Sequence, residues 1–273
     1  MKGFTFANIH SSEYGLYVRS DNRTITPSLR RKSILIPEKH GTIDFDNNTY
    51  DVRNITMHLS LVRKSMEDLR QQARDIAEWL TKDGLLIFDD EPDKAYRAKV
   101  YHNIDIEEIG AYGKSKVTFT CQPFAYMVVD TGDDLTWNEA NFPWTTDIPW
   151  NMNENYKFTA TSNRTFTFDN PGTKEINFKS PLGSRSLIKI NGFWTTLEIE
   201  LNGNLLQYTA EGSGNLVIDN VEMEVNLNGI NKLSDLDGDI DEFLTIIPGN
   251  NLVKIRGTDL NVEVTLDFIP MWI

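Results

Sequence analysis

The chain has 273 residues, 40% of them hydrophobic and 25% charged, and no apolar run approaches the length of a membrane span. Its net charge of −13 argues against general binding to nucleic acid, which depends on clustered lysine and arginine side chains. The single cysteine cannot form an intramolecular disulfide, and residues 1–8 lack the apolar run of an export signal, so we expect folding in a cytoplasm.

The first half of the chain contains strand-like runs separated by turn residues. They span residues 14–18, 33–36, 49–61, 85–88, 95–101 and 116–121. A basic segment of Arg30, Arg31 and Lys32 precedes the second of these runs. Such a segment is either a solvated turn or an electrostatic contact with an acidic neighbouring subunit.

A helix is expected between the third and fourth of these runs. Apolar residues recur every three or four positions and form one stripe, at Met66, Leu69, Ala73, Ile76 and Leu80. Ser65 and Asp68 resemble a capping box at its start, and Gly84 stands where a glycine would end the helix. These elements together predict an α+β domain with mostly antiparallel sheets.

The run at 116–121 is followed closely by a proline. Phe119 and Cys121 alternate with polar residues, as in a strand with one buried face, and Pro123 cannot continue the hydrogen-bond ladder. We therefore expect Cys121 to fill core volume and not to act as a nucleophile. The pattern changes after this point, which predicts a first domain over residues 1–129 and a second over residues 130–273.

The second half has no comparable helical pattern, and short strand-like runs alternate with glycine-containing turns. The runs span residues 165–168, 175–178, 186–190, 196–201, 204–208, 215–218, 222–227, 243–247, 252–256 and 261–268. Regular spacing of this kind predicts an all-β sandwich. The predicted fold class is therefore mainly β, an N-terminal α+β domain with one helix followed by a β-sandwich domain.

The sequence gives no support for catalysis or for a bound cofactor or metal. The acidic run at 235–242 does not have the spacing of a calcium-binding EF-hand loop, so we interpret it as a solvated turn. The four histidines are dispersed, and none pairs with another at metal-ligand spacing; they are His10, His40, His58 and His102. Serine-hydrolase, phosphate-loop and zinc-protease motifs do not occur. We expect a protein that is not an enzyme.

An aromatic and proline-rich stretch lies at the start of the second domain. It contains Trp137, Trp144 and Trp150 and has little regular period. Tryptophans of this kind cover a sandwich edge or seal a subunit contact, and they also stack on sugars. The sequence therefore predicts either an aromatic interface or a sugar platform here.

Short motifs follow one another in a specific order along nearly the whole chain. In the first half they are Phe4-x-Phe6, Tyr14-Gly15-Leu16, Ile36-Pro37 with Gly41, Trp79-Leu80, residues 93–98 and residues 119–126. In the second half they are Asn170-Pro171-Gly172, Ile190-Asn191-Gly192, Ile218-Asp219 and residues 243–251. Their order and spacing resemble the distal tail proteins of long-tailed phages, often called Dit, found mainly in phages and prophages of Gram-positive bacteria.

The resemblance implies a homohexameric ring at the distal end of the phage tail in the virion, or back-to-back rings in isolation. N-terminal domains would form the ring, and galectin-like C-terminal domains would project outward. Such rings join the tail tube protein to the tail-associated lysin or fibre hub, with receptor-binding proteins as further partners and no membrane partner. DNA passes through the hole without specific binding. The chain departs from many relatives at Glu38-Lys39-His40-Gly41, where those have a second glycine.

Two expectations about sites follow. We expect Arg30, Arg31 and Lys32 to lie on an extended arm that reaches an acidic face of the next subunit. An alternative function is that of a carbohydrate-binding module, which would recognise the host cell-wall polysaccharide through the C-terminal sandwich. Fold alone does not confer sugar binding, so the structural adaptor is the leading interpretation.

Overall fold

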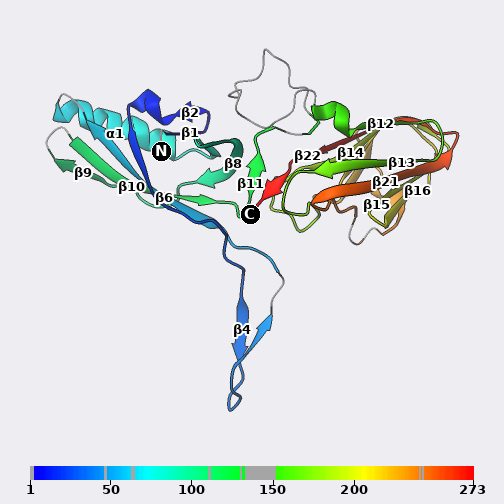
Figure 1. Cartoon of the computed structure of the whole chain (residues 1–273), viewed down its shortest axis with the longest axis horizontal. Coiled ribbons are helices and arrows are strands. Elements are labelled where there is room, and N and C mark those ends of the chain that lie inside the picture. Colours follow the sequence, from blue (N-terminus) through cyan, green and yellow to red (C-terminus); the bar gives the residue numbers. More distant parts are fainter. Residues whose placement is uncertain are drawn as a thin grey trace. The chain divides into compact units, whose positions relative to one another are not determined.

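The computed structural model describes residues 3–45, 48–62, 65–109, 112–129, 131–132, 152–239, 241 and 243–273. The chain is mainly β with antiparallel pairing, as predicted, and its described part has one α-helix (Figure 1). It divides into two compact units, residues 1–125 with residue 273 (unit 1) and residues 126–272 (unit 2).

The division falls four residues before the boundary that was expected after residue 129. The backbone N–H of Met127 donates to Pro270 (3.0 Å), and that of Thr131 donates to Phe268 (3.0 Å). Hydrogen bonds to the end of the chain therefore bind the residues after Tyr126 into unit 2.

Unit 1 is built on one long antiparallel sheet. Its elements are β1 (Phe4–Phe6), β2 (Ile9–His10), a 3-10 helix (Ser11–Tyr14), β3 (Tyr17–Arg23), β4 (Lys32–Leu35), β5 (Thr42–Phe45), β6 (Arg53–Val62), α1 (Met66–Leu80), β7 (Gly84–Phe88), β8 (Glu91–Lys99), β9 (Ile106–Ile109) and β10 (Tyr112–Cys121). The main order is β2-β1-β7-β8-β10-β6-β3, with β9 paired to β10 and with β4 and β5 paired only to each other.

Helix α1 begins and packs as the sequence predicts. The Ser65 side chain accepts the backbone N–H of Asp68 (3.1 Å), which caps the first turn. The interpretation of Gly84 as the terminating glycine is wrong, because α1 ends at Leu80, its C-cap residue Thr81 has right-handed helical geometry, and Gly84 begins β7. A Cβ at Gly84 would lie 2.8 Å from the Cα of Ala7, so this glycine permits a close approach of two chain segments.

Trp79 organises the core beneath α1. Its ring stacks on Phe4 (centroids 5.6 Å apart) and on Tyr14 (5.0 Å), and its indole N–H donates to the carbonyl of Phe6 (2.8 Å). The buried ring contributes free energy through the removal of apolar surface from water. Its N–H keeps a hydrogen-bond partner, so burial leaves no polar atom unpaired. The helix is thereby fixed against β1.

Unit 2 contains two antiparallel sheets. Its elements are β11 (Ala125–Met127), a 3-10 helix (Met152–Tyr156), β12 (Lys157–Ala160), β13 (Arg164–Asn170), β14 (Ser186–Trp194), β15 (Thr196–Leu201), β16 (Asn204–Tyr208), β17 (Gly212–Asp219), β18 (Glu224–Leu227), β19 (Ile230–Asn231), a 3-10 helix (Leu233–Asp235), β20 (Leu236–Gly238), β21 (Gly249–Thr258), β22 (Asn261–Phe268) and β23 (Met271–Trp272). β11 pairs with β23.

The two sheets of unit 2 have the orders β12-β22-β14-β17-β18-β19 and β13-β21-β15-β16-β20. Their inward residues pack together: Trp194 of the first sheet meets Tyr208 of the second edge-on, with ring centroids 5.8 Å apart. Along β14 and β22 buried residues alternate with more exposed ones. The second half is a β-sandwich, as predicted.

Two predicted strands of the second half do not form. Residues 175–178 and 243–247 share one isolated bridge, between Ile176 and Ile246. The backbone N–H of Asn177 donates to the hydroxyl of Ser180 (3.0 Å), and its side-chain oxygen accepts the N–H of Lys179 (2.9 Å). These local bonds form a turn, which replaces the ladder of a strand.

Candidate subunit interface

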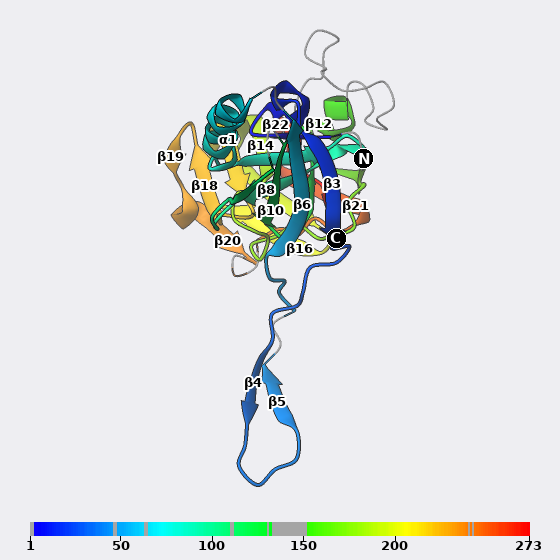
Figure 2. The same cartoon turned by 90° about the vertical axis from the view of Figure 1, so that its left-hand side faces the viewer.

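Strands β4 and β5 form a hairpin that extends away from the main sheet of unit 1 (Figure 2). We call residues 28–51 the arm. At its base the backbone N–H of Arg30 donates to Thr49 (2.8 Å), and that of Asp51 donates to Ser28 (2.8 Å). All the residues of both strands are exposed. The arm is therefore an isolated two-stranded ribbon, a structure that is marginal in water unless something covers it.

One face of the arm is apolar. Ile34 lies opposite Ile43, and Lys32 lies opposite Phe45, so these four side chains share one face. The exposed fractions are 49% for Ile34, 47% for Ile43 and 52% for Phe45. A run of half-exposed apolar side chains on a projecting ribbon is typical of a surface that another molecule covers.

The opposite face of the arm carries an internal ion pair. The guanidinium of Arg31 donates to the Asp44 carboxylate (2.7 Å), and the hydroxyl of Thr42 donates to the same group (3.2 Å). The hydrogen bond from Arg31 lowers the pKa of Asp44, and the hydrogen bond to Asp44 raises the pKa of Arg31. Arg31 is therefore engaged within its own hairpin.

The three predicted basic residues are thus divided by the structure. Arg31 pairs with Asp44, whereas Arg30 and Lys32 are exposed and form no ion pair with any residue that the structure describes. Lys32 lies on the apolar face and Arg30 lies at the base of the arm. The three residues therefore lie in or beside an exposed hairpin, and their contact with an acidic face of a neighbouring subunit stays a prediction.

Two residues in the turn of the arm have a left-handed backbone conformation. The backbone N–H of Lys39 donates to Ile36 (3.2 Å), Glu38 has a φ of 67° and Gly41 has a φ of 88°. Glycine accepts such a conformation without strain, whereas glutamate pays a cost for it. Glu38 is therefore a strained residue in the turn of the arm.

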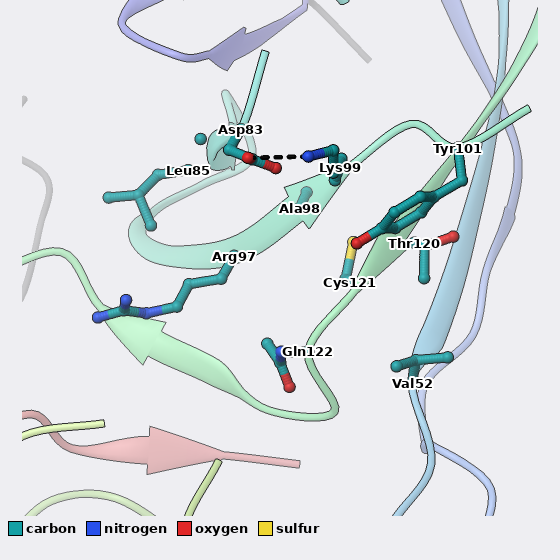
Figure 3. A pocket seen from close by; sticks show the side chains of 11 residues that line it. Val52, Asp83, Leu85, Arg97, Ala98, Lys99, Tyr101, Thr120, Cys121 and Gln122 are labelled. Atoms are coloured by element: carbon teal, nitrogen blue, oxygen red, sulfur yellow. Dashed lines mark hydrogen bonds and ion pairs between the residues drawn. The ribbon is translucent and has the colours of Figure 1, made fainter. Parts of the chain in front are cut away.

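A groove of about 420 Å³ lies in unit 1 beside the start of β6 (Figure 3). Its lining includes three apolar side chains, Val52, Leu85 and Tyr101, which are 41%, 37% and 73% exposed, and Leu85 lies on the side away from Val52 and Tyr101 (Figure 3). Asp83 and Lys99 also line the groove and form an ion pair of 2.9 Å. The groove therefore combines exposed apolar side chains with the Asp83–Lys99 pair and the side chain of Arg97, and its apolar side chains suit contact with an apolar ribbon.

Cys121 lines this groove, and its side chain is 1% exposed. Burial raises the pKa of its thiol to about 12, against a small opposing effect of Arg53. A thiol that stays protonated at neutral pH is a poor nucleophile. The prediction that Cys121 fills core volume is consistent with this environment.

A serine, a histidine and an aspartate meet at one point of unit 1, which the sequence analysis did not foresee. The ring of His10 lies 2.6 Å from the hydroxyl of Ser12 and 3.1 Å from the carboxylate of Asp89. The same ring nitrogen that faces Ser12 also accepts the backbone N–H of that residue (3.2 Å). The arrangement caps the 3-10 helix at Ser11–Tyr14, so it has a structural explanation.

The remaining predicted sites are partly outside the described residues. Trp137, Trp144 and Trp150 lie there, so the structure says nothing of the aromatic interface or sugar platform. In the acidic run, Asp235 pairs with Lys232 (3.1 Å), and Asp239 accepts the backbone N–H of Leu205 (2.8 Å). These two carboxylates serve as local turn and ion-pair partners.

Comparisons with known proteins agree with this architecture. Residues 9–121 match the family model described as the phage tail protein RIFT-related domain. The solved structure of the Dit protein (gp 19.1) of phage SPP1 is described as a paradigm of the hub adsorption apparatus in Gram-positive infecting phages. It matches with a TM-score of 0.64 and 14% identity over 98% of each chain. No curated protein matches the sequence. The fold therefore resembles that of a solved distal tail protein over nearly the whole chain, and residues 9–121 match a phage tail protein domain.

Proposed function

We propose, on the premise that residues 9–121 are a phage tail protein domain and that the chain folds as a distal tail protein, that six copies form a ring at the distal end of a phage tail. Unit 1 forms the ring, and unit 2 is presented on its outside. The ring joins the tail tube protein to the tail-associated lysin or fibre hub, and receptor-binding proteins are further partners. Its role in the virion is that of a structural adaptor and not of an enzyme.

The apolar face of the arm is the observation that carries this proposal. Ile34, Ile43 and Phe45 are about half exposed on a ribbon that lacks a core of its own. A second copy of the chain can cover this face with a different part of its surface. A contact between two different surfaces repeats from copy to copy, and it closes as a ring when the rotation permits.

The groove beside Val52, Leu85 and Tyr101 is the receiving surface that fits best. Both surfaces present partly exposed apolar side chains, so their contact would remove apolar area from water on both partners. The groove and the arm belong to the same unit, so every copy would offer one donor and one acceptor. That is the arrangement a cyclic assembly requires.

Charge acts on this assembly in two opposite ways. Each copy carries a net charge of −13, so copies repel one another at long range. Arg30 and Lys32 on the arm offset part of this repulsion, because they bring positive charge to a neighbouring copy whose net charge is negative. An acidic ring also disfavours adhesion of DNA, so DNA can pass through the hole without being held.

The mass of the purified chain in solution tests this proposal. A six-copy particle, or a particle that grows toward six copies as concentration rises, is the expected result. Because the contact is mainly apolar with an electrostatic component, moderate salt should weaken it without abolishing it. A monomer at every concentration and salt level would contradict the ring.

A further inference from the structure

The two outer faces of the unit 2 sandwich differ in how many of their polar side chains form hydrogen bonds or ion pairs with neighbouring side chains. On the sheet that contains β15 and β21, the carboxylate of Glu200 accepts from Lys254 (2.5 Å) and from Arg256 (2.8 Å). These hydrogen bonds lower the pKa of Glu200, led by the one from Lys254. Neighbouring side chains on this face therefore satisfy one another.

The outer face of the other sheet carries a block of six side chains, which we call the amide patch. β22, β14 and β17 are adjacent, and their register places Glu263, Asn191 and Asn215 in one row and Asn261, Phe193 and Ser213 in the next. Within the described part of the chain, none of these six side chains has a hydrogen bond, ion pair or ring contact. All six are exposed. Their polar groups are therefore available to a ligand.

Phe193 occupies the middle of its row and is 50% exposed. Asn261 flanks it on β22 and Ser213 flanks it on β17. Cross-strand neighbours lie about 5 Å apart, so side-chain amides and a hydroxyl surround an accessible aromatic ring at roughly the width of one sugar ring. An exposed aromatic ring offers apolar contact to the C–H face of a sugar, and amides both donate to and accept from its hydroxyl groups.

Gly192 fixes the geometry of the patch between Asn191 and Phe193. Its φ is 148°, and a Cβ at this position would lie 2.0 Å from the carbonyl oxygen of Asn261. The absence of a side chain lets β14 and β22 remain paired through this point. The two rows therefore stay in register on one continuous surface.

The charges of this face indicate a neutral ligand. Lys189 lies on the same strand, but its ammonium group is 2.5 Å from the carboxylate of Asp267, which is 1% exposed and also binds Arg185 (2.5 Å). The patch itself carries the carboxylate of Glu263, and the whole chain has a net charge of −13. A polyanion such as a polyol-phosphate chain would be repelled by this surface.

We propose that the amide patch on β14, β17 and β22 is a binding site for a neutral polysaccharide, with Phe193 contacting the face of one sugar ring and Asn191, Asn215 and Asn261 binding its hydroxyl groups. This is a binding function of unit 2 that does not depend on formation of the ring. A single shallow site of this kind binds weakly, and several copies in one particle would add to the apparent affinity.

The test uses the full chain on immobilised neutral oligosaccharides of glucose, galactose, rhamnose and N-acetylglucosamine, with poly(glycerol phosphate) beside them. The sugar retained is then titrated against the wild type, Phe193→Ala and Asn191→Ala. The matched control is Leu252→Ala, which removes a 39% exposed apolar side chain from the other outer face. Phe193→Ala should weaken binding roughly tenfold, and Leu252→Ala should leave it unchanged.

Each other outcome overturns the proposal. If the chain is retained only on poly(glycerol phosphate), the site binds a polyanion. If it is retained on none of the probes, the patch does not bind these neutral sugars. Equal affinity of the wild type and Phe193→Ala would place the site elsewhere. A change in particle mass caused by Phe193→Ala without sugar would make the patch a protein contact. An arm variant that stays monomeric should still bind the sugar. Failure of the sugar site can therefore be distinguished from failure of ring formation.

Discussion

Ile34 and Ile43 lie directly opposite each other on β4 and β5, and about half of each side chain is exposed. Two branched apolar side chains that face each other across an isolated ribbon gain little from burial in the monomer. They gain more when a second surface covers them, at about 25 cal/mol for each Å² of apolar area removed from water. In the single chain the arm therefore keeps apolar side chains exposed to water that a second surface could cover.

Phe45→Asp should abolish assembly, because it replaces an apolar side chain of the covered face with a charge. The mass in solution should fall to that of one copy, while the circular dichroism spectrum stays that of the folded chain. Leu35→Asp is the matched control, since it replaces an apolar side chain with the same charge on the opposite face of β4, where Leu35 lies across from Thr42, and it should leave the particle intact. Equal loss of assembly in both variants would contradict the assignment of faces.

Reversing the charge at Arg30 and Lys32 together should weaken assembly most strongly at low salt. Both side chains are exposed, and their attraction to an acidic neighbour is screened as ionic strength rises. The double variant and the wild type should therefore differ by less in 0.5 M salt, a concentration at which the Debye length is only about 4 Å. If the particle remains intact at low and high salt, the electrostatic role of the arm is wrong.

The Arg31–Asp44 pair predicts a lowered pKa at Asp44. The hydrogen bond from Arg31 favours the charged carboxylate, so its contribution to the hairpin is present at neutral pH and is lost as pH falls through the pKa of the folded state. Carbon-detected NMR titration of the Asp44 carboxyl measures this directly. Arg31→Gln should return the pKa toward its ordinary value; an unchanged titration curve would show that the pair does not form in solution.

Cys121 should be unreactive in the native protein at pH 8. Its pKa is raised to about 12 by burial, so the neutral thiol is favoured in the folded state, and its stabilising effect is lost as pH rises between about 9 and about 12. A thiol reagent should modify the native chain at least roughly a hundredfold more slowly than the denatured chain. Equal rates would mean that the floor of the groove opens readily.

Trp79→Phe should destabilise unit 1 by about 1–3 kcal/mol, because the carbonyl of Phe6 loses its buried donor. The two units need not unfold together, so hydrogen–deuterium exchange of peptides from β1 and α1 is the suitable measurement. Exchange there should accelerate, and exchange in β14 should not. Tyr17→Phe, at a 71% exposed ring, serves as the control that should change neither.

The sequence pattern was sufficient for elements with a clear period. The apolar stripe and the serine cap located α1, and alternation located β10 up to Cys121. β5 was missed, although Ile43 and Phe45 alternate with polar neighbours, because its four residues contribute nothing to a buried sheet. Short ribbons outside a core carry a weak signal of this kind.

Contacts that depend on the register between strands could not be predicted from the sequence. Arg31 and Asp44 are separated by 13 positions and meet only because the hairpin closes as it does. The amide patch needs the registers of three strands at once, and two of its residues, Asn191 and Glu263, are 72 positions apart. The interpretation of Gly84 was wrong for a related reason, since its neighbour Ala7 comes from a distant part of the chain.

Imaging of the purified chain by electron microscopy tests whether the arm holds six copies together in a ring. We expect particles with a central hole surrounded by six lobes, and we expect Phe45→Asp to remove these particles while Leu35→Asp retains them. Compact particles without a hole, or rings that persist unchanged in Phe45→Asp, would contradict an assembly held together by the arm.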